Sequence, residues 1–593
     1  MTSLPADEVI SRIGTDASPH VLYEMDSLLR NYAVAENQVQ MGRVMREGSR
    51  DSQTSTRHQL EFENQFDRML GYPAQIRPIF KAIVEPLADR SRRDLGFALG
   101  DALLIADAYS AVLHERRSAV VEEFQVVLDR IPADADQDTV THYLATHMAG
   151  LATFGAAPVE DLADVLAEKT VVPRDGVALI LKTLTTSLGS QTELRSMTDT
   201  NSLRRRPVVG LPDGRGLWAV PDDFIHIALD WAADTCAQDD ALLKVFDRSR
   251  QTVCEQLAHQ TLASVFSDQY VHLSPTYPAE GQRPDIDVLV ATPGATVVVE
   301  VKAGRFTDAA RRAAPDRVRR KSREFIDKAL DQNTRTITHL HSGATNLLDR
   351  NGRRLSIPNS PHIVSVIVTL DRVDPFATYL PDGGKRGGVP ETGTWLVNLA
   401  DLIMTADVLG DPAEFYPYAE LRARINKIGG PRIFVEADAL GTWCEHRIEP
   451  VTPSPGELAM ISTTSDSMND YYTFVSSEDH SEQPPRPSSG IPAEVLNALG
   501  KVLDNRPEHW HGLATAAAAL PPARWATVQR ALSNSNSQRP SRRARKRVRR
   551  ALHGIQMSDN LTVYVQNATE HNREVSSADL LVEPENPSSN STQ

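Results

Sequence analysis

The residues best suited to chemistry lie between positions 284 and 302, where the chain reads PDIDVLVATPGATVVVEVK. Two apolar runs flank Thr292-Pro293-Gly294-Ala295, a sequence typical of a turn. We therefore expect an antiparallel hairpin. A two-residue loop that pairs Thr292 with Ala295 and a four-residue loop that pairs Ala291 with Thr296 both give the same register.

In that register Asp287 lies opposite Glu300, and Asp285 lies opposite Lys302. Side chains alternate across a strand, so all four of these residues share one face. Directly opposed residues have Cβ atoms about 4.5–5.5 Å apart, and two carboxylates at that distance repel each other unless a cation lies between them. The other face is apolar, and its burial would leave the charged face at the functional edge of the sheet: Ile286, Val288, Val290, Val297, Val299 and Val301.

Two carboxylates and a lysine on one face suit the hydrolysis of a phosphodiester. Hard oxygen ligands at short range select Mg²⁺, with Mn²⁺ as a substitute, over zinc. Such an ion polarises a phosphoryl oxygen and lowers the pKa of a bound water. A lysine beside that water can orient it or stabilise the charge that develops on the phosphoryl oxygens.

The spacing of these residues resembles the motif of the PD-(D/E)xK, or restriction-endonuclease-like, nuclease superfamily. Asp287 is followed after twelve residues by Glu300 and then, after one more, by Lys302. The phrases IDVLV and VVEVK look most like the nuclease-related and resolvase-like branches. The resemblance implies an αβββαβ core and magnesium-dependent cleavage of DNA, or less often RNA. It also implies that Asp287 and Glu300 bind the metal and that Lys302 is the catalytic lysine.

Two further residues enter through the same resemblance. In these branches a glutamate on the preceding helix often joins the metal site, and Glu255 stands where that residue would be. A glutamine on the helix after the lysine often points back at the site, and Gln332 lies on the apolar side of that helix. The alternatives are a solvated helix edge for Glu255 and an ordinary helix position for Gln332. A long basic insertion after Lys302 departs from the family pattern.

Net charge argues against a surface that coats nucleic acid everywhere, since the chain carries -15 at pH 7. Two local runs are strongly basic, and local potential steers a polyanion. Residues 311–323 hold seven Arg or Lys against one Asp, and residues 539–550 hold eight with no acid. Contact with phosphates and a solvated face are both open readings of these runs. The candidate nucleic-acid-binding residues are Arg311, Arg312, Arg319, Arg320, Lys321, Arg323, Arg545, Lys546 and Arg547.

Composition favours a soluble protein of the cytoplasm. The three cysteines are far apart and form no CxxC pair, which argues against a zinc ribbon or a disulfide framework. The N-terminal residues lack the basic and apolar regions of a signal peptide. No segment approaches the ~18 uninterrupted apolar residues of a membrane span.

At 593 residues the chain is long enough for several domains. Helical periodicity without a chemical motif predicts an α-helical accessory or oligomerisation region at the N-terminus. Apolar runs and helical stripes then predict a central α/β core, a mixed sheet flanked by helices, of the restriction-endonuclease-like class. A Ser-, Thr-, Pro- and acid-rich stretch reads as a linker. The expected domains are a helical accessory domain over 1–205, a nuclease-like α/β domain over 206–450, the linker over 451–490, a small basic helical unit over 491–555 and a disordered acidic tail over 556–593.

Within the central region the sequence predicts particular elements. They are a hairpin over 207–220, helices over 223–236 and 240–266, strands over 269–273, 286–291 and 296–302, a basic helix over 316–341, strands over 363–370 and 395–398, and helices over 400–408 and 412–426.

The sequence therefore predicts a metal-dependent deoxyribonuclease in defence against foreign DNA or in repair, with DNA as its partner and RNA left open. The alternatives are an ordinary solvated hairpin face, and a catalytically silent scaffold of the same fold that binds nucleic acid or protein. No P-loop or other motor motif is present, so any unwinding needs a separate motor or defence partner. A homo-oligomer formed through residues 1–205 is also compatible with the sequence.

Overall fold

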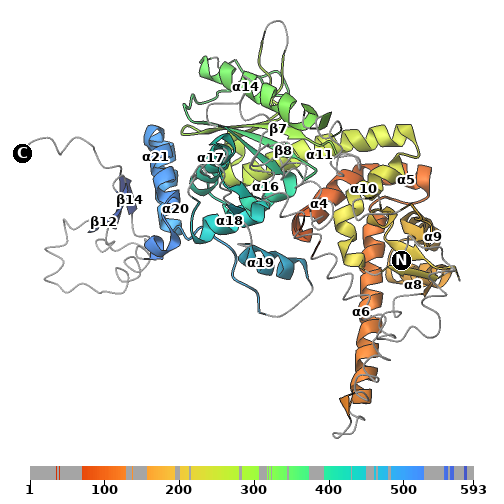
Figure 1. Cartoon of the computed structure of the whole chain (residues 1–593). Coiled ribbons are helices and arrows are strands. Elements are labelled where there is room, and N and C mark those ends of the chain that lie inside the picture. Colours follow the sequence, from red (N-terminus) through yellow and green to blue (C-terminus); the bar gives the residue numbers. More distant parts are fainter. Residues whose placement is uncertain are drawn as a thin grey trace, which may run out of the picture. The chain divides into compact units, whose positions relative to one another are not determined.

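The described residues fold into a mixed α/β protein (Figure 1). The structure is a computed structural model. It describes residues 70–128, 157–193, 201–212, 215–218, 220–279, 283–305, 323–343, 346–372, 393–428, 430–433, 435–448, 465–477 and 482–526, together with the short segments 460–461, 553–558, 561–565 and 580–583 and a few isolated residues.

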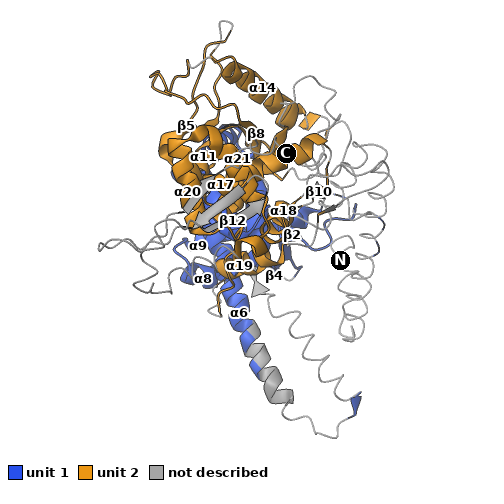
Figure 2. Ribbon diagram, turned by 90° about the vertical axis from the view of Figure 1, so that its left-hand side faces the viewer, with its two compact units in different colours: residues 1–46, 58–253, 307–314 blue, residues 47–57, 254–306, 315–593 orange. Residues whose placement is uncertain are grey.

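The chain divides into two compact units (Figure 2). The first comprises residues 1–46, 58–253 and 307–314, and the second comprises residues 47–57, 254–306 and 315–593. The division falls within the long helix α11 (Asp240–Phe266). No helix in the described part of the chain has both the length and the apolar character needed to cross a membrane.

The first unit combines helices with a small sheet. Its strands lie in the order β1-β4-β3-β2, and β3 pairs antiparallel with β4 so that Val208 lies opposite Trp218. The helices are α4 (Pro73–Val84), α5 (Ala88–Leu95), α6 (Asp101–Leu128), α8 (Val159–Lys169), α9 (Arg174–Leu184) and α10 (Phe224–Cys236), and the strands are β1 (Ala157–Pro158), β2 (Thr185–Ser187), β3 (Val208–Gly210) and β4 (Arg215–Trp218).

A chain of aromatic contacts explains why this unit extends beyond residue 205. The buried Trp218 ring lies 5.5 Å from Tyr109 of α6 and 5.7 Å from Phe224 of α10. Phe224 in turn packs edge-on against Trp231 at 5.7 Å. The β3–β4 hairpin and α10 thus share the core of the preceding helices, a tertiary relationship that local periodicity does not reveal.

The second unit is built on a five-stranded sheet in the order β5-β6-β7-β8-β9. The first three strands are antiparallel, whereas β8 and β9 run parallel to β7. The strands are β5 (Val271–Leu273), β6 (Val288–Ala291), β7 (Thr296–Lys302), β8 (Ile363–Thr369) and β9 (Thr394–Asn398).

Helices cover both faces of this sheet (Figure 1). Helix α14 (Lys328–His341) packs against β7 and β8, while α16 (Leu399–Val408) and α17 (Pro412–Ile428) pack against β8 and β9. A short π-helix (Arg323–Asp327) precedes α14. Parallel strands in a covered sheet read as continuous apolar runs, which accounts for the valine-rich sequence of β7. The expectation that only one face of the hairpin is buried is therefore wrong: β7 is the central strand.

The C-terminal part of the second unit departs from the sequence expectations. The segment expected to be a linker contains helix α19 (Asp466–Ser476), in which Met468 and Tyr472 are buried. It also contributes strand β11 (Met460–Ile461), which pairs with β10 (Arg432–Ile433). These described residues therefore form regular structure with buried side chains, and are not a linker throughout.

Residues near position 490 are also fixed to the core. Arg447, which follows α18 (Glu436–Glu445), donates a hydrogen bond of 2.6 Å to the Ser489 carbonyl and one of 2.9 Å to the Leu520 carbonyl. Helices α20 (Ala493–Asn505) and α21 (Pro507–Ala518) pack against α17.

The tail expected to be disordered contains strands in its described residues. An antiparallel sheet is formed by β12 (His553–Ser558), β13 (Leu561–Val565) and β14 (Leu580–Glu583). Short apolar runs such as that of β14 allow these strands despite the polar composition of the tail as a whole.

Candidate active site

The hairpin of β6 and β7 has the register predicted from the sequence. Val288 pairs with Val299 and Ala291 pairs with Thr296. The N–H of Thr292 donates a hydrogen bond of 3.0 Å to the Ala295 carbonyl and closes the turn. Asp287 thus stands one residue before the first pair of the ladder, and Glu300 stands one residue after it.

Three hydrogen bonds fix the chain around Asp287. Its carbonyl accepts one of 2.9 Å from the Ser274 N–H, at the end of β5. Its Oδ2 accepts one of 2.7 Å from the N–H of Val301 in β7. The carbonyl of Pro275 accepts one of 2.9 Å from the Ile286 N–H. The Asp287 carboxyl group is therefore held against the C-terminal end of β7, where it is buried.

Glu300 and Lys302 are the third-last and the last residue of β7. Glu300 lies in the centre of the sheet, opposite Ile367 of β8, and is only 4% exposed. The Lys302 ammonium group donates a hydrogen bond to Glu300 Oε1, and the Lys302 side chain is 20% exposed. The Lys302 side chain is therefore partly exposed to solvent, while the Glu300 carboxylate that it contacts is buried.

Gln332 reaches the same point from α14. The Lys302 ammonium group donates a hydrogen bond of 2.9 Å to Gln332 Oε1. The rotation of α14 is fixed by its neighbour, the buried Asn333, whose Nδ2 donates hydrogen bonds of 3.0 Å to Ser365 Oγ and to the Val366 carbonyl in β8. The sequence motif did not single out Asn333. Its place in the same helical stripe as Ala329, Leu330 and Ile337 is a signal that could have found it.

The segment that follows Lys302 lies close to the π-helix that precedes α14. A Cβ atom at Gly304 would collide with the ring of Phe325 in the π-helix, so a larger residue at this position would have to displace that ring. This contact brings the start of the helical segment close to the end of β7.

Glu255 lies on α11, in the second unit, and its side chain is 18% exposed. Its negative charge is one of the causes that raise the pKa of Asp287. Its carboxylate also lies 4.0 Å from the guanidinium of Arg350, which in turn donates a hydrogen bond of 2.8 Å to Ser274 Oγ. Arg350 was not foreseen from the sequence, because it belongs to no motif.

Asp285 pairs outside the β6–β7 ladder. The β6–β7 ladder ends at Val288, and Asp285 instead forms an isolated bridge with Thr276. The β6–β7 ladder thus does not extend to a pair between Asp285 and Lys302, and the bridge to Thr276 continues the pairing of β6 with β5 instead. Asp285 is exposed, and its charge still contributes to raising the pKa of Glu300.

Burial dominates the electrostatics of the two carboxyl groups. It raises the pKa of Asp287 to about 8, with further contributions from Glu300 and Glu255, against the lowering effects of the Val301 N–H and Lys302. Burial also raises the pKa of Glu300, while Lys302 and a hydrogen bond with Asp287 act in the opposite direction. Burial of two neighbouring carboxyl groups disfavours the ionisation of both, and a bound cation would offset their charge.

The donor set fits a hard divalent cation. Asp287 and Glu300 offer carboxylate oxygens, the ligands that Mg²⁺ takes in small number alongside water. Among the residues that the structure describes, no group of three or more His, Cys, Asp or Glu is arranged to hold a metal ion. Glu255 is thus near enough to act on Asp287 electrostatically but does not complete a three-carboxylate cluster.

The candidate nucleic-acid-binding residues are only partly described. Arg320 and Arg323 are exposed. Lys321 donates a hydrogen bond of 2.9 Å to Glu324 and lies over the Phe325 ring, 4.7 Å from its centroid. The remaining six lie outside the described residues: Arg311, Arg312, Arg319, Arg545, Lys546 and Arg547.

Comparison with known proteins gives no relative: no family model matches the chain, and neither the curated proteins nor the solved structures contain a significant match.

Proposed function

We propose that the second unit is a metal-dependent nuclease that hydrolyses phosphodiester bonds in DNA. The observation that carries the proposal is the convergence at the end of β7: Lys302 bonds both Glu300 and Gln332, beside the buried Asp287. These residues come from two strands and a helix that is separated from them in sequence. A solvated hairpin face would give no reason for a buried carboxyl pair beside a lysine and a glutamine.

The order of elements supports the proposal. Helix α11 is followed by β5, β6 and β7, then by α14 and β8, with β8 parallel to β7. This is the αβββαβ order implied by the resemblance to PD-(D/E)xK nucleases. The residues that the resemblance assigns to the motif follow this order, with Asp287 directly before β6 and Glu300 and Lys302 at the end of β7.

The proposed division of labour follows from charge and burial. Asp287 and Glu300 would hold Mg²⁺, or Mn²⁺ in its place, through their ionised carboxylates. When bound, the ion supplies Lewis-acid polarisation of the phosphate and lowers the pKa of water. Lys302, fixed between Glu300 and Gln332, positions the attacking water and offsets negative charge on the phosphoryl oxygens. Gln332 acts through Lys302 as a positioning residue.

Basic side chains on the segment before α14 fit a polyanionic substrate. Arg320 and Arg323 are exposed, and they precede the helix that carries Gln332. Phosphate contacts of this kind are independent of base sequence. Defence against foreign DNA and DNA repair are the settings we propose for such an activity.

The test uses the full-length chain with supercoiled plasmid DNA, linear duplex DNA and single-stranded RNA, each at millimolar Mg²⁺ and with excess EDTA. We expect cleavage of DNA that requires the metal. Metal-independent binding of DNA without cleavage in any condition would refute the nuclease and support a catalytically silent scaffold instead. Cleavage of RNA alone would overturn the assignment of DNA as the substrate.

A further inference from the structure

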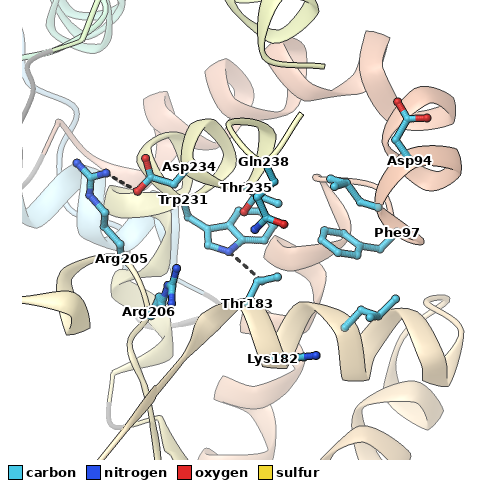
Figure 3. Close-up of a pocket in the computed structure, with 12 residues that line it drawn as sticks. Asp94, Phe97, Lys182, Thr183, Arg205, Arg206, Trp231, Asp234, Thr235 and Gln238 are labelled. Atoms are coloured by element: carbon cyan, nitrogen blue, oxygen red, sulfur yellow. Dashed lines mark hydrogen bonds and ion pairs between the residues drawn. The ribbon is translucent and has the colours of Figure 1, made fainter. Parts of the chain in front are cut away.

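The first unit contains a cavity of about 370 Å³ that the proposed nuclease does not use (Figure 3). Its walls come from α5, α9 and α10 and from the segment before β3. Sites for small molecules range over ~300–1,000 Å³, so this cavity is large enough for a small organic ligand.

The floor of the cavity is aromatic and rigid. Phe97 and Trp231 are both buried, and their rings are stacked with centroids 6.2 Å apart and an interplanar angle of 25°. The indole N–H of Trp231 donates a hydrogen bond of 3.1 Å to Thr183 Oγ1, which fixes the ring (Figure 3). Leu95 and Leu179 add aliphatic surface. A preformed apolar wall of this kind suits a flat ring.

The rim carries an excess of positive charge. Three cationic side chains line the cavity: Lys182, Arg205 and Arg206. Arg205 forms an ion pair with Asp234, so its charge is already offset. Lys182 and Arg206 are exposed, and neither has an ion pair with another residue in the described part of the chain.

The acidic side chains of the rim do not offset these two charges. Asp94 pairs with Arg90 on α5, and Asp234 pairs with Arg205. In Figure 3 Lys182 and Arg206 flank Thr183, whereas Asp94 lies at the other end of the cavity. Two cations on one side of an apolar floor suit a phosphate group, which accepts charge-assisted hydrogen bonds from both.

Two polar side chains at the C-terminal end of α10 also line the cavity. Thr235 is buried and Gln238 is exposed, and both line the cavity. A hydroxyl and an amide offer donors and acceptors to the edge of a heterocycle. A ligand that matches the whole cavity has a flat ring with polar edges and an anionic group at one end.

We propose that this cavity binds a mononucleotide, with the base against Trp231 and Phe97 and the phosphate at Lys182 and Arg206. The proposal is independent of the nuclease activity, because every residue that carries it lies in the first unit.

The test is isothermal titration calorimetry of the full-length chain with AMP, GMP, CMP and UMP, and with adenosine, ribose 5-phosphate and inorganic phosphate as comparisons. At least one mononucleotide should bind about tenfold or more tightly than its parts, since each charge-assisted hydrogen bond adds roughly that factor. Lys182→Gln and Arg206→Gln should each weaken this binding about tenfold. Lys81→Gln, which removes an exposed cation from α4 outside the cavity, should leave it unchanged.

Thermal melts of the variants check that all three fold like the wild type. Lys302→Met, in the second unit, should bind the nucleotide normally, because the proposed nuclease site takes no part in this binding. The proposal is overturned if none of the four nucleotides binds at millimolar concentration. It is also overturned if ribose 5-phosphate binds as tightly as the nucleotide, or if Lys182→Gln and Arg206→Gln bind like the wild type.

Discussion

Lys302 at the end of β7 donates a hydrogen bond of 2.9 Å to Gln332 Oε1 on α14, thirty residues further along the chain. The same ammonium group bonds Glu300. Lys302 is thus held by an acceptor on its own strand and by one on the covering helix. A lysine side chain has several freely rotating bonds, so two acceptors restrict it far more than one does.

Replacement of Gln332 by leucine should lower kcat about tenfold and change KM little, because the lysine loses an acceptor that fixes it while the substrate contacts remain. Gln332→Glu keeps an acceptor oxygen in the same place and should recover part of the rate. Asp331→Leu, at an exposed neighbouring position of α14, is the matched control and should keep the wild-type rate. A Gln332→Leu enzyme with unchanged kcat would show that the bond to Lys302 has no part in catalysis.

The two aspartates before β6 should respond differently to mutation. Asp287 is buried and accepts a hydrogen bond from the Val301 N–H, whereas Asp285 is exposed and bridges to Thr276 outside the hairpin ladder. We expect Asp287→Asn to lose metal-dependent cleavage by roughly 10²-fold or more, the size of effect seen when a preorganised electrostatic group is removed. Asp285→Asn should keep a measurable fraction of the activity.

Cleavage rates of both variants at saturating Mg²⁺ decide between these assignments. An inactive Asp285→Asn together with an active Asp287→Asn would mean that the metal site is built from the other aspartate.

The raised pKa of Asp287 predicts a pH-dependent stability in the absence of metal. The pKa is about 8 in the folded chain, against an ordinary value of 3.8. Because the folded value is the higher one, the stabilisation is fully present below about pH 4 and is lost as the pH rises through about 8. Each unit of pKa difference corresponds to ~1.4 kcal/mol. Asp287→Asn cannot ionise, so it escapes this loss.

Denaturant unfolding in EDTA at about pH 5 and about pH 8 measures the difference. Between these two values the free energy of unfolding of the wild type should fall, relative to Asp287→Asn, by at least ~1 kcal/mol. Millimolar Mg²⁺ should restore the stability of the wild type at the higher pH and leave the variant unchanged. Parallel pH profiles for the two proteins would contradict the raised pKa.

The hairpin and its register could be predicted from the sequence because the turn at Thr292–Ala295 sets the pairing of the residues on either side of it. Helix α11 was predicted with its observed bounds for a similar reason, since its apolar stripe is local. The position of Asp285 could not be predicted in this way. Its partner, Thr276, lies on a neighbouring segment that does not belong to the hairpin.

The role of Gln332 also depends on tertiary structure. Periodicity placed it on the apolar side of its helix, but which sheet residue it meets is decided by the anchoring of Asn333 to Ser365 and Val366. Helix α19 was missed because the average composition of residues 451–490 hides the pair Met468 and Tyr472. The resemblance to a nuclease family could suggest Gln332, whereas spacing alone could not.

A buried ion pair next to the sheet offers a test of the fold that is independent of function. Arg422 of α17 is fully buried and donates two hydrogen bonds of 2.8 Å to the Glu436 carboxylate, which also accepts one of 2.5 Å from the Tyr418 hydroxyl. Glu436→Gln should reduce the free energy of unfolding by about 3–5 kcal/mol, because a buried guanidinium loses its counter-charge.

Glu445→Gln, on the same helix α18 but exposed, is the matched control and should cost less than about 1 kcal/mol. Equal stability of the two variants in urea unfolding would mean that Arg422 and Glu436 are not buried together.

The central claim is that Lys302 serves a metal-dependent cleavage of DNA at the end of β7. The measurement that tests it most directly is the initial rate of supercoiled plasmid nicking at saturating Mg²⁺ by the wild type, by Lys302→Met and by Lys328→Met, an exposed lysine on α14 that serves as the matched control. Methionine keeps an unbranched side chain as far as Cε and lacks the ammonium group. We predict nicking by the wild type and by Lys328→Met, none in EDTA, and a loss of roughly 10²-fold or more in a folded Lys302→Met. Equal nicking by a folded Lys302→Met and the wild type would contradict the account.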